Sequence, residues 1–225
     1  MAVEFRTERG DLHFQATFSK PMFALWRSPD QLFDLLFEAL SKHGLQLSDL
    51  KWGQPTAVAD VQLNFSLFNY AAAVRIRIDR VEIDVFNSLG VNQEQLQDAA
   101  TALINALKAH NADLSLVAYV VAVGCHGRLA SGSSKDFTRA FAAGAPEAAG
   151  PSTGAGAVFY YGPSEDRVSS AVTIDLSAVL PEALFFRVQM VWDAARVEIG
   201  TLAVRSRQYG ERVFEAFGLT PVAAQ

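Results

Sequence analysis

The chain has 225 residues, of which half are hydrophobic and 16 are phenylalanine. So many apolar side chains can bury a substantial core, and we expect an ordered globular protein of one large domain or two small ones. The 24 acidic and 19 basic residues give a net charge of −5. This balance argues against a nucleic-acid partner, because phosphate backbones are normally bound by a concentrated basic surface.

The single cysteine and the apolar runs bear on where the protein works. One cysteine forms no internal disulfide, and the first residues, MAVEFRTERGD, have no apolar core of the signal-peptide kind. The longest apolar run, residues 114–123, has half of the ~20 residues that a membrane helix needs. We therefore expect a cytoplasmic protein that does not bind membranes, and the alanine-rich composition is typical of a bacterial source.

The first predicted elements are a β-hairpin and a helix. Residues 3–18 alternate apolar and polar side chains, and the charged ERGD at 8–11 predicts the turn between two strands. The helix is expected to start at Ser28, whose side chain can form a capping box with Gln31. Gly44 can adopt the left-handed conformation that ends it.

A strand-rich region follows the first helix. The alternation of apolar and polar residues at 61–85 predicts three strands. Arg75 and Arg77 then lie on the outer face of one strand, and Glu82 and Asp84 lie on the outer face of the next. We expect these opposite charges to form cross-strand pairs.

Two further helices are predicted. Asn92 and Gln95 have the spacing of a capping box at the start of the second helix, and a strand at 114–123 comes after that helix. The third helix covers 200–217 and ends at Gly218. Gly210 lies within its apolar stripe, which predicts a close approach to the element beneath.

Runs of strands followed by helices are typical of α+β proteins. We predict eight or nine mostly antiparallel strands in one or two sheets, with three amphipathic helices packed on them. A strand-rich region with two helices is expected at 1–131, a flexible segment at 132–157, and strands with a C-terminal helix at 158–225, all in one domain. A strand–helix order recurs loosely around 3–43, 61–110 and 158–217, but no period or shared motif supports a duplication.

The flexible segment has an unusual composition. Residues 142–157, AAGAPEAAGPSTGAGA, carry one charge and no large side chain, which predicts a linker or loop. Just before it, Phe137 and Phe141 stand four residues apart on one face of a short predicted helix. Two interpretations stay open: a helical turn docked on its own core, or a mobile lid or partner-binding peptide at 134–157.

The stretch AVGCHGRLASGSS at 122–134 comes nearest to a catalytic motif. If the strand alternation continues through it, Cys125 points into the core and His126 points to the opposite face. Neighbours on opposite faces of a strand cannot serve each other as nucleophile and base. Gly124 and Gly127 can mark a bulge that breaks the alternation. A buried lone cysteine behaves as a small hydrophobe, so Cys125 and His126 are weak catalytic candidates.

The other chemistry-bearing residues match no known motif. The four histidines are scattered, with no two at helical ligand spacing, so we predict no metal site. The glycine-rich stretches lack the lysine of a phosphate loop, and SGSSK at 131–135 lacks the further motifs of serine–lysine hydrolases. We expect no cofactor, and we favour a protein that is not an enzyme.

The leading hypothesis is a protein that acts through protein–protein contact, as an assembly, adaptor or regulatory component. Its partner would be another protein or a second copy of the chain. Sheet edges or the 134–157 segment would make the contact. Phe137, Phe141, Trp26 and Tyr160 are the candidate interaction residues, because aromatic side chains are enriched at interfaces.

The alternative hypothesis is a small-molecule binder or a cavity enzyme. A closing helix over a sheet resembles, in topology only, the helix-grip ligand-binding folds. The ligand would then lie between the sheet and the third helix, with Tyr161, Arg187, Gln189 and Trp192 lining the cavity. Arg187 and Gln189 alternate with apolar residues, and a polar side chain that faces inward there would indicate a ligand.

Overall fold

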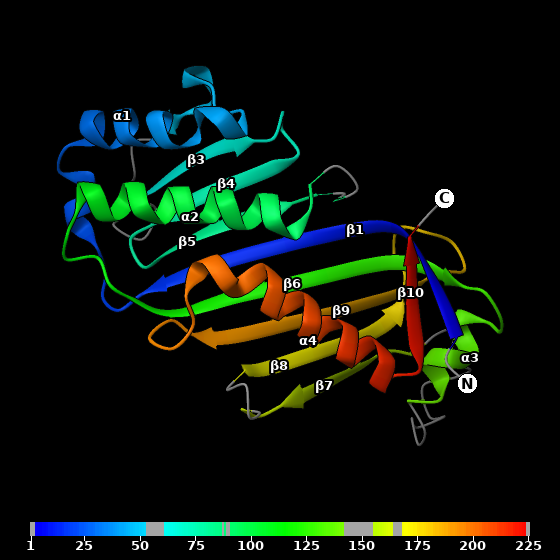
Figure 1. The fold of residues 1–225 in the computed structure, drawn as a ribbon. Coiled ribbons are helices and arrows are strands. Elements are labelled where there is room, and N and C mark those ends of the chain that lie inside the picture. The colour runs from blue at the N-terminus through cyan, green and yellow to red at the C-terminus, as the bar shows by residue number, and fades with distance from the viewer. Residues whose placement is uncertain are drawn as a thin grey trace, which may run out of the picture. The chain divides into compact units, whose positions relative to one another are not determined.

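The computed structural model describes residues 3–52, 61–86, 88, 91–141, 155–163 and 168–223. Within these ranges the predicted α+β class is confirmed, with nine strands on one hydrogen-bonded path and helices of 12, 18 and 15 residues (Figure 1). The strands are β1 (Val3–Phe18), β2 (Lys51–Trp52), β3 (Gln62–Leu67), β4 (Ala72–Arg77), β5 (Arg80–Val85), β6 (Leu116–Leu129), β7 (Ala157–Tyr161), β8 (Val168–Leu176), β9 (Leu184–Asp193) and β10 (Leu219–Ala223). The helices are α1 (Pro29–Leu40), α2 (Gln93–His110), α3 (Ser134–Arg139) and α4 (Leu202–Ala216), with single 3-10 turns η1 (Phe23–Trp26), η2 (Ser41–His43), η3 (Leu47–Asp49) and η7 (Ile199–Thr201).

The strand order reveals a repeat of topology. The strands pair in the order β2-β3-β4-β5-β1-β6-β9-β8-β7, and β10 pairs with β1 in parallel. The chain first lays down β1, α1, β3, β4, β5 and α2, and then lays down β6, α3, β7, β8, β9 and α4. Apart from the two-residue strand β2, which comes just before β3, each series is a long strand, a helix, three strands and a long helix. The repeat therefore has two parts, at 3–110 and 116–216, instead of the three ranges that the sequence pattern indicated.

The chain forms two compact units that are built from separated segments. The α1–α2 unit consists of Leu12–Val121 and Val191–Arg205. The α4 unit consists of the residues up to Asp11, of Ala122–Met190 and of the residues from Ser206 onward. Strands β1, β6 and β9 each contribute residues to both units. Residues that are close in one unit can therefore be far apart in the sequence.

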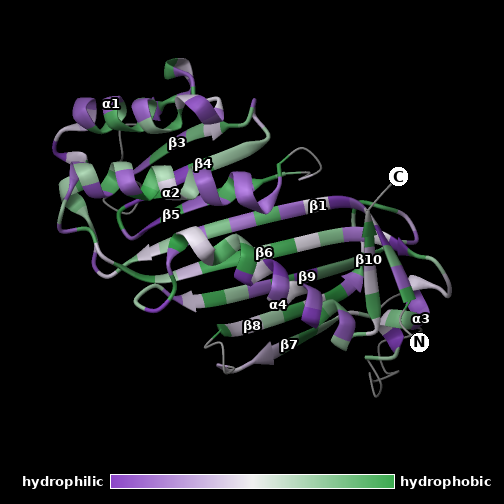
Figure 2. Cartoon of the chain, in the orientation of Figure 1, coloured by the Kyte–Doolittle hydropathy of each residue, from purple (hydrophilic) through white to green (hydrophobic). Residues whose placement is uncertain are grey.

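Charged pairs cover one face of the sheet in the α1–α2 unit. Strands β4 and β5 pair with Arg75 opposite Glu82, and Arg75 Nε lies 3.2 Å from Glu82 Oε2. Arg77 Nε lies 3.7 Å from the same oxygen, and Arg75 also pairs with Asp84. The predicted cross-strand pairs are confirmed. The opposite face is apolar and buried, and the resulting alternation appears as bands along the strands (Figure 2).

Both predicted helix starts in this unit are at the right residues, but only one capping box forms. The Asn92 side chain accepts a hydrogen bond from the Gln95 backbone at 2.9 Å, and the Gln95 side chain accepts one from the Asn92 backbone at 3.0 Å. In the described structure the Ser28 side chain makes no capping bond; its ψ is 74°, whereas Asn92 has an extended ψ of 173°. Gly44 has the predicted left-handed backbone, with φ of 86°.

The predicted hairpin at residues 3–18 is wrong, because β1 is one continuous strand. Val3–Thr7 pair with β10, and Leu12–Thr17 pair with β5. The charged residues 8–11 therefore mark a change of partner instead of a reversal of the chain. Gly10 does not adopt the positive φ that a tight hairpin turn requires.

Aromatic rings pack between α4 and the sheet of the α4 unit. The Phe214 ring lies 4.3 Å from that of Phe186 on β9 and 5.9 Å from that of Phe5 on β1. Gly218 ends the helix with a φ of 72°, as predicted. The predicted close approach at Gly210 is wrong, since a Cβ added there would meet nothing within 4 Å.

Two glycine substitutions should have opposite effects on stability. Gly210→Ala should raise the free energy of unfolding by about 0.5–1 kcal/mol, because alanine loses less backbone entropy in a helix and the site has room. Gly127→Ala should lower it by about 1–3 kcal/mol, because the new Cβ would lie 2.2 Å from the Arg6 carbonyl oxygen. Urea unfolding of the two variants measures both, and a destabilised Gly210→Ala would contradict the packing described for α4.

Candidate functional site

The Cys125–His126 pair lies within a strand. Strand β6 continues to Leu129, six residues beyond the predicted end at 123. The Cys125 thiol hydrogen-bonds to the side chain of Thr7, and burial raises its pKa to about 11. A thiol with this pKa is protonated at neutral pH and is a poor nucleophile.

His126 is held by two polar partners and an aromatic ring. His126 is buried, with 8% of its surface exposed. Nδ1 lies 2.9 Å from Ser177 Oγ, and Nε2 lies 3.6 Å from Asp11 Oδ2. The imidazole also stacks on the Phe185 ring, with 4.6 Å between the centroids. These residues could not be predicted as a set from the sequence, because they are far apart along the chain and follow no motif.

A serine, a histidine and an aspartate in contact invite comparison with a hydrolytic triad. The Ser177 oxygen, however, already accepts hydrogen bonds from the backbone N–H groups of Val179 at 3.2 Å and Leu180 at 2.9 Å. With both lone pairs occupied, Ser177 donates its proton to His126 Nδ1 and has no lone pair left for attack on a substrate. The set therefore attaches the loop after β8 to strand β6.

Burial and the neighbouring charges favour the neutral form of His126. Burial lowers the pKa of His126, and Arg9 lowers it further, while Asp11 raises it; the net direction is downward. A neutral imidazole accepts the Ser177 proton at Nδ1 and presents N–H to Asp11 at Nε2. The hydrogen bond to the loop therefore depends on the uncharged form of His126.

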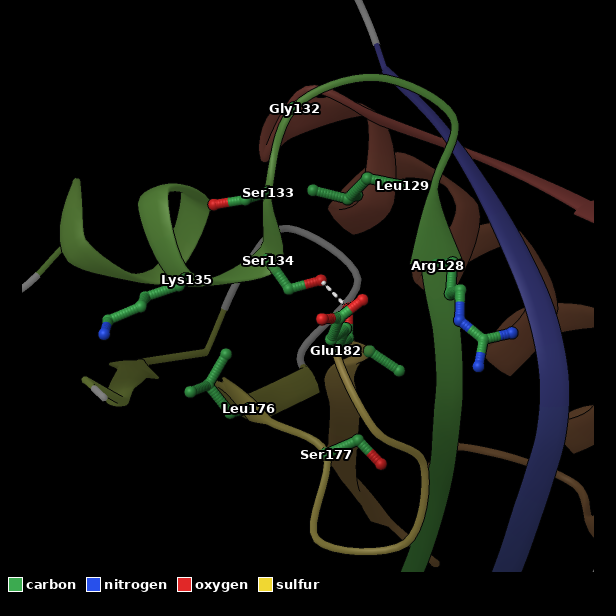
Figure 3. Close-up of a pocket in the computed structure, with 10 residues that line it drawn as sticks. Arg128, Leu129, Gly132, Ser133, Ser134, Lys135, Leu176, Ser177 and Glu182 are labelled. Atoms are coloured by element: carbon green, nitrogen blue, oxygen red, sulfur yellow. Dashed lines mark hydrogen bonds between the residues drawn. The ribbon is translucent and has the colours of Figure 1, made fainter. Parts of the chain in front are cut away.

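A cavity of about 660 Å³ lies beside this loop. It is lined by the end of β6, the start of α3, the end of β8 and the loop before β9 (Figure 3). Ser177 belongs both to its wall and to the His126 contact. The Ser134 hydroxyl donates a 3.0 Å hydrogen bond across the cavity wall to the Glu182 carbonyl oxygen. The volume falls within the range of about 300–1,000 Å³ that is typical of small-molecule sites.

The residues predicted to line a ligand cavity are not brought together. Burial alternates along β9, so Trp192 lies with the buried face, whereas Arg187 and Gln189 lie on the other face. Arg187 donates a 3.4 Å hydrogen bond to Gln189, and Tyr161 is exposed. None of the four lines the 660 Å³ cavity. The space beneath α4, where the ligand was expected, is occupied by the aromatic rings described above.

The candidate interaction residues also lie in different places. Phe137 on α3 and Phe141, two residues beyond the end of α3, are 5.4 Å apart between ring centroids. Phe141 lies 5.7 Å from both Phe159 and Phe217. The short helix is thus docked on aromatic rings of its own unit. Trp26 is half-buried in the α1–α2 unit. The rest of the flexible segment, residues 142–154, lies outside the described residues.

Strand β7 is an edge of the described sheet. It pairs with β8, from Ala157 opposite Ile174 to Tyr161 opposite Ser170, and ends the strand order. Phe159 points to the aromatic rings, while Val158 and Tyr160 point outward and are 49% and 82% exposed. The strand contains no charged residue. An uncharged edge with an exposed apolar face can pair with another strand.

Metal ligands, membrane-spanning helices and known relatives also bear on the chemistry of the chain. In the described ranges no three His, Cys, Asp or Glu side chains gather closely enough to hold a metal ion. The helices found there all fall short of the length and apolarity needed to span a bilayer. No known protein family matches the sequence, and no curated protein is significantly similar to it.

Alkylation should reveal the raised pKa of Cys125. A shift from the ordinary value of 9.0 to about 11 leaves roughly 100-fold less thiolate at a given pH below 9. Iodoacetamide should therefore modify the folded protein about 100-fold more slowly than the urea-unfolded protein. Comparable rates in the two states would show an accessible, reactive thiol.

Protonation of His126 at acidic pH should lower the free energy of unfolding. The pKa of His126 in the folded protein is below the ordinary 6.5, so the unfolded chain binds the proton first as the pH falls. As the pH falls from about 6.5 to the lower pKa of the folded protein, His126 therefore decreases the free energy of unfolding. Below that folded pKa, His126 causes no further decrease. Urea unfolding from about pH 7.5 to about pH 5 should show a smaller loss for His126→Gln than for the wild type. Equal losses would refute the effect.

Proposed function

We propose that this protein is a non-enzymatic component that works through protein–protein contact, as an assembly, adaptor or regulatory factor. The observation that carries the proposal is the uncharged strand β7, which ends the order of the described strands and exposes Val158 and Tyr160. A partner segment, from another protein or from a second copy, would add to this edge as an extended strand.

Strand addition suits this edge for two reasons. An edge strand presents backbone N–H and C=O groups along its outer side, and these groups give affinity to an added strand. Many natural proteins protect such edges with charges, proline or a bulge, and β7 contains no charged residue and no proline. The two exposed side chains then select the partner, since Tyr160 is a residue type that is enriched in binding hot spots.

The contact is local to the α4 unit. The β7 backbone is positioned by its pairing with β8 and by the Phe159 ring, which lies 5.2 Å from that of Phe217. The edge is therefore held rigidly before a partner arrives, and a rigid edge loses less entropy on binding. We also propose a cytoplasmic location, since a single cysteine indicates no need for an oxidising compartment.

A charge placed on this edge should abolish the contact. Val158→Lys puts an ammonium group on the outward face of β7 and should weaken partner binding at least about tenfold, which corresponds to about 1.4 kcal/mol. Val117→Lys is the matched control, because Val117 is 48% exposed but lies on β6, between two neighbouring strands.

Two measurements test this prediction. Light scattering of the purified protein measures self-association, and pull-down from a lysate of the source organism measures a heterologous partner. A species that is retained by the wild type and by Val117→Lys, but lost from Val158→Lys, supports the proposal. Equal behaviour of all three proteins in both measurements would refute it.

A further inference from the structure

We propose that the strand added to β7 is β7 of a second copy of this chain, paired antiparallel about a two-fold axis at Phe159. This inference rests on the strand addition proposed above and names its partner. Its support comes from the side-chain pairs that this register creates, from the aromatic rings around Phe159, and from the two glycines that flank the strand.

An antiparallel pair of identical strands is symmetric, and the position of the two-fold axis fixes which residues face each other. With the axis at Phe159, Ala157 lies opposite Tyr161 of the second copy and Val158 lies opposite Tyr160 of the second copy. All five residues of β7 are then paired with β7 residues. An axis at Val158 or at Tyr160 leaves two of the five outside the pairing.

This register pairs the two outward side chains of β7 with each other. Val158 is 49% exposed and Tyr160 is 82% exposed, which is the largest value for a large hydrophobic residue in the described ranges. Val158 of each copy lies opposite Tyr160 of the other copy, so the pair occurs twice in the dimer. A β-branched residue opposite an aromatic residue is a favourable cross-strand pair. The second copy therefore covers both exposed side chains with residues of the same kind.

Phe159 occupies the axis on the opposite face of the strand. Its ring lies 5.7 Å from that of Phe141 and 5.2 Å from that of Phe217, yet Phe159 is only half-buried. In the dimer Phe159 lies opposite Phe159 of the second copy, with about 4.5–5.5 Å between the Cβ atoms. The two rings can then contact each other, and the aromatic clusters of the two copies become continuous.

The residues on either side of β7 permit the close approach of a second copy. Gly156 precedes the strand and Gly162 follows it, and the register places Gly156 opposite Gly162 of the second copy. Neither glycine brings a side chain to the ends of the contact. Residues 156–162 also carry no charge, so no like charges meet across the axis. Pro163 has no backbone N–H with which to extend the ladder.

The second copy is favoured over a different protein because β7 supplies its own complement. Closed two-fold dimers are the commonest oligomers of soluble proteins, and an isologous contact needs one surface that matches itself. A contact of five residues a side is smaller than a standard protein interface. We therefore expect a reversible dimer that forms as the protein concentration rises.

Sedimentation velocity of the full-length protein, at concentrations up to about 1 mM, measures this dimer. The wild type should change from monomer to dimer over the series. Val158→Lys should require at least about tenfold more protein, because two ammonium groups would be buried in each contact. Val117→Lys should behave as the wild type, since Val117 is similarly exposed but lies away from β7 on β6. Circular dichroism checks that both variants are folded.

Disulfide crosslinking tests the register. When Val158→Cys and Tyr160→Cys proteins are mixed, the two thiols lie directly opposite each other, at a separation that suits a disulfide. In either variant alone the thiols of the two copies are diagonal, with Cα atoms about 7–8 Å apart, which is too far without backbone movement. Mild oxidation should therefore give several-fold more covalent dimer from the mixture than from either variant. The wild type measures the background from Cys125, whose thiol is protonated at neutral pH.

Three outcomes would overturn the inference. One is a wild type that stays monomeric throughout the concentration series. Another is a dimer that Val158→Lys leaves unchanged. The third is equal crosslinking in the mixture and in the separate variants, which would place the axis elsewhere. A monomeric wild type that still retains a lysate protein, lost from Val158→Lys, would refute self-pairing and leave strand addition at β7 standing with a different partner.

Discussion

The packing of phenylalanine rings under α4 determines how the rest of the α4 unit is arranged. Phe186 on β9 contacts Phe214 and Phe217, at the end of α4, and Phe217 in turn contacts Phe141 and Phe159. Rings at these centroid distances of 4.3–5.7 Å gain dispersion and quadrupole energy beyond their burial. The same contacts exclude a ligand from the space beneath α4, dock α3 on the core, and turn β7 so that Val158 and Tyr160 face outward.

Local signals in the sequence predicted local structure well. The Asn92–Gln95 capping box, the Gly44 helix end and the Arg75–Glu82 pair all depend on residues that are close along the chain or on adjacent strands. The hairpin at 8–11 was mispredicted because the same charged residues suit a turn and a strand that changes partner. The first half of β1 pairs with β10, which comes from the other end of the chain. No local sequence pattern can predict such a long-range pairing.

The candidate site was less predictable for the same reason. The cavity joins residues from 128 to 183, and the His126 set joins Asp11 to Ser177. The sequence drew attention to Cys125 and His126 because they are adjacent, but adjacency on a strand separates side chains. The neighbours that matter to each of them, Thr7 for the thiol and Ser177 for the imidazole, are 118 and 51 residues away. Only the fold brings such partners together.

Strand β7 and the 660 Å³ cavity both border strand β8, at different parts of it. Strand β7 pairs with the Ser170–Ile174 stretch, and the cavity begins past this pairing, at Leu176 and Ser177. Backbone hydrogen bonds would dominate at the edge, because β7 contains no charged residue. Salt screens exposed charges within about 10 Å at 0.1 M, so strand addition at β7 depends little on ionic strength.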